Sequence, residues 1–406
     1  MTEPSRELAA SFDLGKLTAD FYADPYPYYA ALQEYEPVKL MPDGSYFLTR
    51  YRDILGVYKN TDACSSDKKV EFKPKYGDTP LYEHHTTSLV FNDPPLHTRV
   101  RRLIFGALTA RAIAELEPAL IALVDNLIDE MAQKREVDLI EDFASAIPVE
   151  VIGNLLAVPR NERGPLREWS LAILGALEPV VTPAAAERGN RAVTEFIAYL
   201  EGLIEDRRKN PGNPEKDVLT KLIQGDVNGE KLTPKELLHN CIFLLNAGHE
   251  TTTNLIGNGL VALDRFPEQK QRLLADPGLI KAAIEEVLRY ESSNQLGNRI
   301  TVKPVEVGGV MMPENTKITV CIGAANRDPH EFPEPAKFDI GRAPNRHLAF
   351  ASGIHQCVGM NLARLEGAIA ISRFLARFPK YELTSSPTGG GRARFRGFLK
   401  VPARVA

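Results

Sequence analysis

Phe350-Ala-Ser-Gly353-Ile-His355-Gln-Cys357-Val-Gly359 stands directly before a long helical pattern that begins at Met360. Cys357 therefore lies just before a helix N-terminus, where backbone N–H groups and the helix dipole favour a thiolate. Glycines at positions 353 and 359 let the backbone turn and approach a flat neighbour closely. We therefore interpret Cys357 as a functional thiol, and the isolated cysteines 64, 241 and 321 as small buried hydrophobes.

Helical periodicity dominates the chain outside this stretch. Apolar residues recur at helical spacing over residues 110–134, 143–156, 166–177, 185–208 and 360–378, and residues 267–290 predict two more helices. Thr233-Pro234-Lys-Glu236 is a capping box, and the pattern behind it continues to about Phe266. At 1.5 Å per residue this helix would span roughly 45–50 Å, so it should form the spine of a domain. Its weak middle, residues 247–253, predicts a local opening.

Strand signals are shorter and lie near the two ends. Val38 to Met41 and Tyr46 to Thr49 flank an Asp43-Gly44 turn, which predicts a hairpin. Residues 300–320 alternate like strands, and residues 381–405 predict hairpin strands around glycines 389–391. Residues 64–87 are charged and predict an irregular loop.

Composition excludes several classes of protein. The 49 Lys and Arg residues nearly balance the 53 Asp and Glu residues, and the chain has no polybasic tail, so nucleic acid is not an expected partner. The four cysteines include no C-x-x-C pair, which fits a reducing cytosol. No apolar run approaches about 20 residues, so we expect no membrane span and a cytoplasmic location.

Two motif-like stretches are decoys. Gly257-Asn-Gly259-Leu-Val-Ala262 matches a dinucleotide fingerprint, but it lies within a predicted helix rather than after a strand. We interpret its glycines as points of close helix packing. His249-Glu250 begins like a zinc-protease motif, but Thr253 replaces the second histidine.

The thiol loop and three further segments together resemble the cytochrome P450 family. Phe350-x-x-Gly353-x-x-x-Cys357-x-Gly359 is similar to its haem-binding loop. Glu286-Val-Leu-Arg289, with Arg342, resembles its E-x-x-R brace. Ala247-Gly248-His-Glu250-Thr251 resembles the oxygen-activating segment of its central helix, and the segment 93–101 resembles the one from which bacterial members reach the haem.

The resemblance implies a mainly α (α+β) fold, with a long central helix over the haem and a small β-rich lobe. It implies one domain over residues 1–406. The β-rich lobe would take about 24–60, 300–320 and 381–405, and the helical lobe about 99–290 and 360–378.

The resemblance also assigns roles to residues. Cys357 would be the axial ligand of the iron of haem b (iron protoporphyrin IX). Glu250 and Thr251 would relay protons, and Glu286, Arg289 and Arg342 would form a structural brace. The residues implied to bind the cofactor, besides Cys357, are His97, Arg101, Arg299, His355, Phe350, Gly353, Gly359, Ala247 and Gly248. Cations suit this task because haem presents two propionates.

Residues expected to border the substrate are Leu244, Ala247, Asn294, Gln295, Leu296, Phe395 and Phe398. The polar run Ser292 to Gln295, together with Lys68, Lys69 and Arg396, predicts a small, mostly apolar substrate that bears a polar or anionic group.

The implied activity is monooxygenation of a small organic substrate with dioxygen, by hydroxylation or oxidative demethylation. The chain has no flavin or nicotinamide motif, so electrons are expected from a separate 2Fe–2S ferredoxin and an NAD(P)H-dependent ferredoxin reductase. They would dock on the thiolate face, and a monomer is expected. Two alternatives are a peroxide-using haem-thiolate enzyme and a haem-based gas sensor or carrier. The acid–alcohol pair Glu250-Thr251 argues against both.

Overall fold

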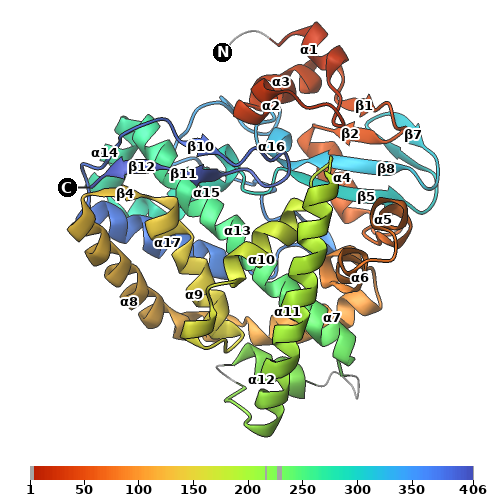
Figure 1. Ribbon diagram of the computed structural model, residues 1–406. Coiled ribbons are helices and arrows are strands. Elements are labelled where there is room, and N and C mark those ends of the chain that lie inside the picture. Colours follow the sequence, from red (N-terminus) through yellow and green to blue (C-terminus); the bar gives the residue numbers. More distant parts are fainter. Residues whose placement is uncertain (1–3, 215–216, 226–230, 406) are drawn as a thin grey trace.

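The computed structural model of the protein describes residues 4–214, 217–225 and 231–405, and it is mainly helical (Figure 1). The α-helices that precede the central helix are α1 (Arg6–Ser11), α2 (Ala19–Ala23), α3 (Tyr26–Tyr35), α4 (Tyr51–Lys59), α5 (Lys69–Tyr76), α6 (Pro80–Thr87), α7 (Leu96–Ala107), α8 (Ala110–Lys134), α9 (Ala146–Leu155), α10 (Leu166–Gly175), α11 (Pro183–Lys209) and α12 (Val218–Gln224). The later ones are α13 (Pro234–Arg265), α14 (Pro267–Ala275), α15 (Ile280–Tyr290), α16 (Ile322–Ala325) and α17 (Met360–Arg377).

Short helical turns and strands connect these helices. Single 3-10 turns cover Leu89–Phe91, Arg160–Glu162, Pro277–Leu279 and Gly353–His355, and a π-helical turn covers Ile140–Ala144. The strands are β1 (Val38–Leu40), β2 (Tyr46–Leu48), β3 (Cys64–Ser65), β4 (Glu136–Asp138), β5 (Leu296–Thr301), β6 (Val305–Val307), β7 (Val310–Met312), β8 (Lys317–Cys321), β9 (Glu382–Leu383), β10 (Thr388–Gly389), β11 (Phe398–Lys400) and β12 (Pro402–Arg404).

The largest sheet has the order β1-β2-β8-β5-β3. The predicted hairpin forms its first pair, with Val38 opposite Leu48, and β2 continues parallel to β8. β5 is antiparallel to both β8 and β3. The strands near the C-terminus belong to other sheets, because β10 pairs with β11 and β12 lies between β4 and β9. The division of residues 1–406 into two lobes of one domain stays a prediction.

Helix α13 is the spine that the sequence predicts, and Figure 1 shows it crossing the middle of the molecule. Both hydrogen bonds of the capping box are present, between the Thr233 and Glu236 side chains and backbones. The helix packs against α9, α10, α11, α15 and α17. A Cβ at Gly257 would lie 2.6 Å from Ile140, and one at Gly259 2.6 Å from Ile371, so these glycines serve close packing.

Two local predictions are wrong. Residues 64–87 are not a loop, because β3, α5 and α6 occupy them. These helices are short, and their buried residues Phe72, Tyr76 and Leu81 pack into the core and hold them in place. Helix α13 also continues without interruption through residues 247–253. Tertiary packing on several sides outweighs the weak helix propensity of that segment.

Candidate active site

The loop before α17 presents one cysteine to a large internal cavity. The 3-10 turn Gly353–His355 reverses the chain, and the N–H of Cys357 donates to the carbonyl of Phe350 at 3.0 Å. Cys357 lines the cavity and is exposed to it, whereas the other three cysteines are buried. Desolvation raises the pKa of the Cys357 thiol, but the Gly359 N–H and the charges of Arg101 and Arg364 counteract part of this rise.

The cavity has a volume of about 340 Å³ and gathers most of the predicted site. The predicted residues that line it are Cys357, His97, Arg101, Arg299, His355, Phe350, Gly359, Ala247, Gly248, Thr251, Leu244, Asn294, Leu296 and Phe395. They come from α7, α13, β5 with the residues just before it, the loop before α17 and the segment before β11, which are far apart in the sequence. The cavity wall is mostly apolar elsewhere, as expected for an organic ligand.

Four predicted residues lie elsewhere. Gly353, with φ +70°, packs against helix α4, where a Cβ would come within 2.4 Å of the carbonyl oxygen of Tyr58. Gln295 is fully buried, and its amide donates to the carbonyl of Ser292 at 2.7 Å. Phe398 and Glu250 line a separate small cavity. The amino-acid sequence alone does not reveal the directions of these side chains, because they depend on which face of its helix or loop each residue occupies after folding.

Cationic and imidazole groups on one side of the large cavity fit the haem that the family implies. In the part of the chain that the structure describes, Arg101 and Arg299 form no ion pair with a carboxylate. The His97 and His355 rings lie 4.1 Å apart, and both ring nitrogens of His97 lack hydrogen-bond partners among the described residues, whereas Nε2 of His355 lies 4.0 Å from Oδ1 of Asp93. Burial lowers the pKa of His97 to about 4. The propionates of haem would supply the missing acceptors, and open space at the Gly359 Cβ position leaves room for a flat ring.

The acid–alcohol pair points to two sides of α13. Thr251 faces the large cavity, and its hydroxyl donates to the carbonyl of Ala247 at 2.7 Å. Glu250 faces the small cavity, where Arg392 donates to its Oε1 at 2.5 Å and Oε2 has no partner among the described residues. Burial raises the pKa of Glu250 to about 7, although Arg392 acts to lower it. This cavity of about 30 Å³ has room for about one water molecule.

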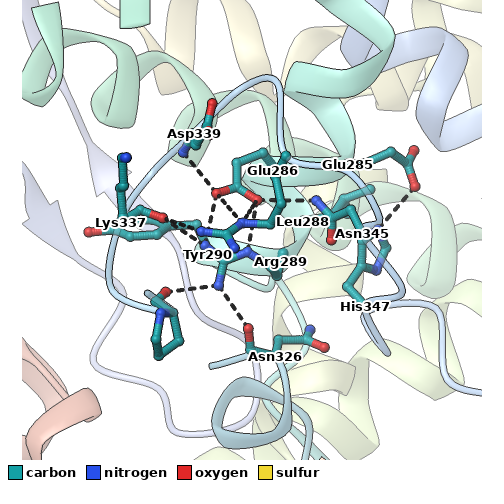
Figure 2. Close-up of polar contacts among 12 residues, drawn as sticks. Glu285, Glu286, Leu288, Arg289, Tyr290, Asn326, Lys337, Asp339, Asn345 and His347 are labelled. Carbon is teal, nitrogen blue, oxygen red and sulfur yellow. Dashed lines mark hydrogen bonds and ion pairs between the residues drawn. The ribbon is translucent and has the colours of Figure 1, made fainter. Parts of the chain in front are cut away.

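The predicted brace is a fully hydrogen-bonded buried cluster, and Figure 2 shows it. Arg289 donates to both oxygens of Glu286 at 2.8 Å, and neither side chain is exposed. The remaining donors of Arg289 reach the carbonyls of Asn326, Pro335 and Lys337, each at 2.9 Å. Glu286 also accepts from Asp339 N, Asn345 and Arg342. The cluster therefore ties α15 to the loop that leads to Cys357.

The cations expected near the substrate are already used elsewhere. Lys68 is 1% exposed and binds Glu71 at 2.6 Å, and Lys69 binds Asp67 at 2.6 Å. Arg396 binds Glu291 at 2.6 Å and donates to two backbone carbonyls. Of the polar run, Ser293 and Asn294 line the cavity, whereas Ser292 does not.

Sequence reasoning missed two charged residues in the large cavity, Glu366 and Arg394. Glu366 is 2% exposed on α17, burial raises its pKa to about 8, and its Oε2 has no partner within the described ranges. The feature of the sequence that could have revealed Glu366 is a carboxylate placed among the apolar residues of a predicted helix. Arg394 gives no such signal, because it stands in a run of alternating arginines at positions 392, 394 and 396.

Comparisons with known proteins identify the family. The family model "Cytochrome P450" matches residues 174–388. "Biotin biosynthesis cytochrome P450" of Bacillus subtilis (strain 168) is 34% identical, over 90% of this chain and 92% of that one. "Cytochrome P450 monooxygenase PikC" of Streptomyces venezuelae is 38% identical, over 92% and 89%. The crystal structure of P450BioI with a hexadec-9Z-enoic acid ligated acyl carrier protein matches with a TM-score of 0.90 and 33% identity, over 96% of this chain and all of that one.

The chain therefore belongs to the cytochrome P450 family. Within that family it is a monooxygenase of the bacterial type, and its mainly helical fold with small sheets is the fold that the sequence predicts. Among the described residues, no helix is both long and apolar enough to cross a membrane.

Proposed function

We propose that the protein binds haem b through Cys357 and inserts one atom of dioxygen into a small organic substrate, by hydroxylation or oxidative demethylation. The observation that carries this proposal is one cavity that Cys357 enters from the loop before α17 and Thr251 enters from α13. When bound, thiolate-ligated haem supplies the chemistry of dioxygen activation. A structural relative, P450BioI, is known in complex with a hexadec-9Z-enoic acid ligated acyl carrier protein, which supports an organic, largely apolar substrate for this chain as well.

The residues of the chain would hold the cofactor in three ways. Cys357 would provide the sulfur ligand. Arg101 and Arg299, which form no ion pair with a carboxylate among the described residues, would neutralise the two propionates, and the imidazoles of His97 and His355 would donate hydrogen bonds to them. The brace around Glu286 and Arg289 would fix the loop on which Cys357 stands.

Glu250 and Thr251 would move protons toward the cavity. A carboxyl group with a pKa of about 7 can both give and accept a proton near neutral pH. It stands on the small polar cavity, and the Thr251 hydroxyl stands on the large one, so α13 would pass protons from one side to the other. Thr251 would orient the last donor of this path.

Electrons would come from a 2Fe–2S ferredoxin and its NAD(P)H-dependent reductase, on the face around the cysteine loop. Of the arginines there, Arg364 is held by Glu285 at 2.7 Å and Arg101 by the carbonyl of Gln356 at 2.7 Å. Arg102 and Arg346 are exposed and can meet an acidic partner. The cytoplasmic location and the monomeric state remain predictions from the sequence.

The test combines a spectrum and turnover. The reduced protein with carbon monoxide should absorb near the wavelength typical of thiolate ligation, and Cys357→His should lose that band. Product should form with a ferredoxin, its reductase and NAD(P)H. If hydrogen peroxide alone supports faster turnover than the ferredoxin system, the enzyme is of the peroxide-using kind and this proposal is wrong.

A further inference from the structure

Arg394 is a cation in the large cavity that the proposed haem clamp does not use. It stands between Ala393 and Phe395 just before β11, and Phe395 forms an isolated bridge with Asn294. Both Arg394 and Phe395 line the cavity. The guanidinium therefore belongs to the wall contributed by the chain near β11, whereas Cys357 enters from the loop before α17.

The guanidinium is held in a fixed position. Its Nε donates to the carbonyl of Leu177 at 2.9 Å, and Nη1 donates to the carbonyl of Leu296 at 3.0 Å. Nη2 donates to the side-chain oxygen of Asn298. An arginine has five N–H groups, so two of them remain for a ligand. A group anchored in this way loses little freedom on binding.

The charge of Arg394 is not neutralised by a direct ion pair. Among the residues that the structure describes, no carboxylate lies within 4.0 Å of it, and the nearest acidic influences are Glu178 and Glu71. Glu71 is paired with Lys68. Glu178 accepts the backbone N–H groups of Ala393 and Arg394 at 2.8 and 3.1 Å.

A third cation stands in the same region. The ammonium of Lys75 donates to the carbonyl of Glu178 at 3.0 Å. Glu71 and Glu178 act on both Lys75 and Arg394, and Glu71 is in addition the ion-pair partner of Lys68. Neither carboxylate is therefore reserved for Arg394, whose side chain lines the cavity.

Polar groups without partners stand on the same cavity. Ser293 is 6% exposed and its hydroxyl has no hydrogen-bond partner among the described residues. His85 is 1% exposed and its Nε2 likewise has none. Both side chains line the cavity with Arg394, while much of the remaining wall is leucine and isoleucine. Buried polar groups normally have partners, so unpartnered ones on a cavity indicate a ligand.

We propose that Arg394 anchors the carboxylate of a mostly apolar substrate, with the Ser293 hydroxyl as a further donor. This inference rests on the proposed function, because the anchor would decide which carbon of the substrate faces the oxidising end of the cavity. It replaces the cations that the sequence suggested, Lys68, Lys69 and Arg396, with one that reaches the cavity.

The test measures binding by calorimetry on the haem-loaded protein, so that it needs no turnover. The probes are dodecanoic acid against 1-dodecanol, and 4-butylbenzoic acid against 4-butylbenzyl alcohol. Within each pair the wild type should bind the acid more tightly. Arg394→Gln should weaken binding of the acids about 10- to 100-fold, the range for a hydrogen bond to a charged group, and leave the alcohols within about two-fold. Arg394→Lys should restore part of the preference.

Lys69→Gln is the matched control, because Lys69 is a nearby cation that binds Asp67 and does not line the cavity. It should leave all four affinities unchanged. The proposal is overturned if the wild type binds each alcohol as tightly as its acid, or binds none of the acids. It is also overturned if a folded Arg394→Gln variant weakens acids and alcohols equally. A missing thiolate band with carbon monoxide would instead contradict the proposed function, while the acid preference would still report on Arg394.

Discussion

The Arg392 guanidinium donates a 2.5 Å hydrogen bond to Oε1 of Glu250, while Oε2 of this carboxylate has no hydrogen-bond partner within the described ranges. Arg392 also donates to the carbonyl of Leu171 at 3.0 Å, so it cannot move freely with the carboxylate. Burial raises the pKa of Glu250 to about 7, and Arg392 lowers it from a still higher value. The carboxyl group is thus fixed through Oε1, while its raised pKa and its second oxygen suit it to exchange a proton near neutral pH.

This pair predicts the pH dependence of turnover. If Glu250 donates protons, turnover falls as the pH rises through its pKa of about 7. Arg392→Gln removes the charge that lowers this pKa, so the falling limb should move upward by about 1–3 pH units. Glu250→Gln should slow turnover, and its kcat should no longer fall as the pH rises through about 7. The measurement is kcat against pH with saturating reductase and ferredoxin.

Arg167→Gln is the control for this experiment. Arg167 lines the same small cavity, but it donates to both oxygens of Glu141 and lowers the pKa of Glu250 less than Arg392 does. The falling limb of the pH profile of Arg167→Gln should therefore move far less than that of Arg392→Gln. An Arg392→Gln profile that matches the wild type would show that this arginine does not set the proton supply.

Local signals in the sequence were enough to place the main helices. The Thr233 capping box fixes the start of α13, and the side chains of Thr109 and Thr182 cap α8 and α11 by accepting one backbone hydrogen bond each. Each signal lies within one helical turn, so no tertiary information is needed. Helices α5 and α6 were missed because they are short and charged, although Thr79 with Pro80 is a cap signal of the same kind.

Charge partners could not be predicted, because they depend on the folded structure. Lys68, Arg396 and Arg364 all resemble free cations in the sequence, but each is bound by a carboxylate. Arg394 resembles its neighbours Arg392 and Arg396, but of these three arginines it is the one that lines the large cavity, and it has no ion-pair partner among the described residues. The face that each side chain presents decides this difference, and a pattern of alternating arginines does not reveal it.

The brace predicts a large stability loss from single substitutions. Glu286→Ala would leave Arg289 buried without its carboxylate, and Arg289→Ala would leave Glu286 unpaired and three carbonyls without donors. Removing one partner of a buried pair costs about 3–5 kcal/mol. We expect low yield and little haem, measured as the ratio of Soret to protein absorbance.

Arg404→Ala supplies the comparison for the brace. Arg404 and Glu136 form a 2.9 Å pair whose side chains are 59% and 60% exposed. Exposed pairs contribute little, so this variant should have the haem content and thermal midpoint of the wild type. Good yield of haem-loaded Glu286→Ala would show that the buried pair is not needed for folding.

Glu366 predicts a pH-dependent stability. In the unfolded chain a glutamate loses its proton near pH 4.3, whereas burial holds the pKa of Glu366 at about 8 in the folded protein. Between these values the folded state binds the extra proton, so stability falls as the pH rises. Glu366→Gln keeps the shape without this cost, and its stability relative to wild type should increase from about pH 4.3 to pH 8 and then level off.

Urea unfolding of both proteins at several pH values checks the Glu366 prediction. Glu205→Gln is the control, because Glu205 is exposed and Lys209 lowers its pKa, which gives a change of the opposite sign or none. A constant difference between Glu366→Gln and wild type across the range would mean that the carboxyl group is ionised in the folded protein.

Thr251 should control the fate of oxygen rather than the binding of substrate. Its hydroxyl faces the large cavity and is held by the carbonyl of Ala247 at 2.7 Å, where it can orient a water and pass on a proton. Thr251→Ala should keep the haem spectrum and the substrate affinity and still consume reductant, but release hydrogen peroxide in place of product. Thr251→Ser should keep much of the coupling between reductant consumption and product formation.

Thr253→Ala is the matched control, because the Thr253 hydroxyl donates in the same way to the carbonyl of His249 at 3.0 Å but lines the small cavity. Reductant consumed, peroxide formed and product formed are measured in one assay. If Thr251→Ala stays as tightly coupled as wild type, its hydroxyl is not in the proton path, and Thr252, which also lines the large cavity, becomes the residue to test.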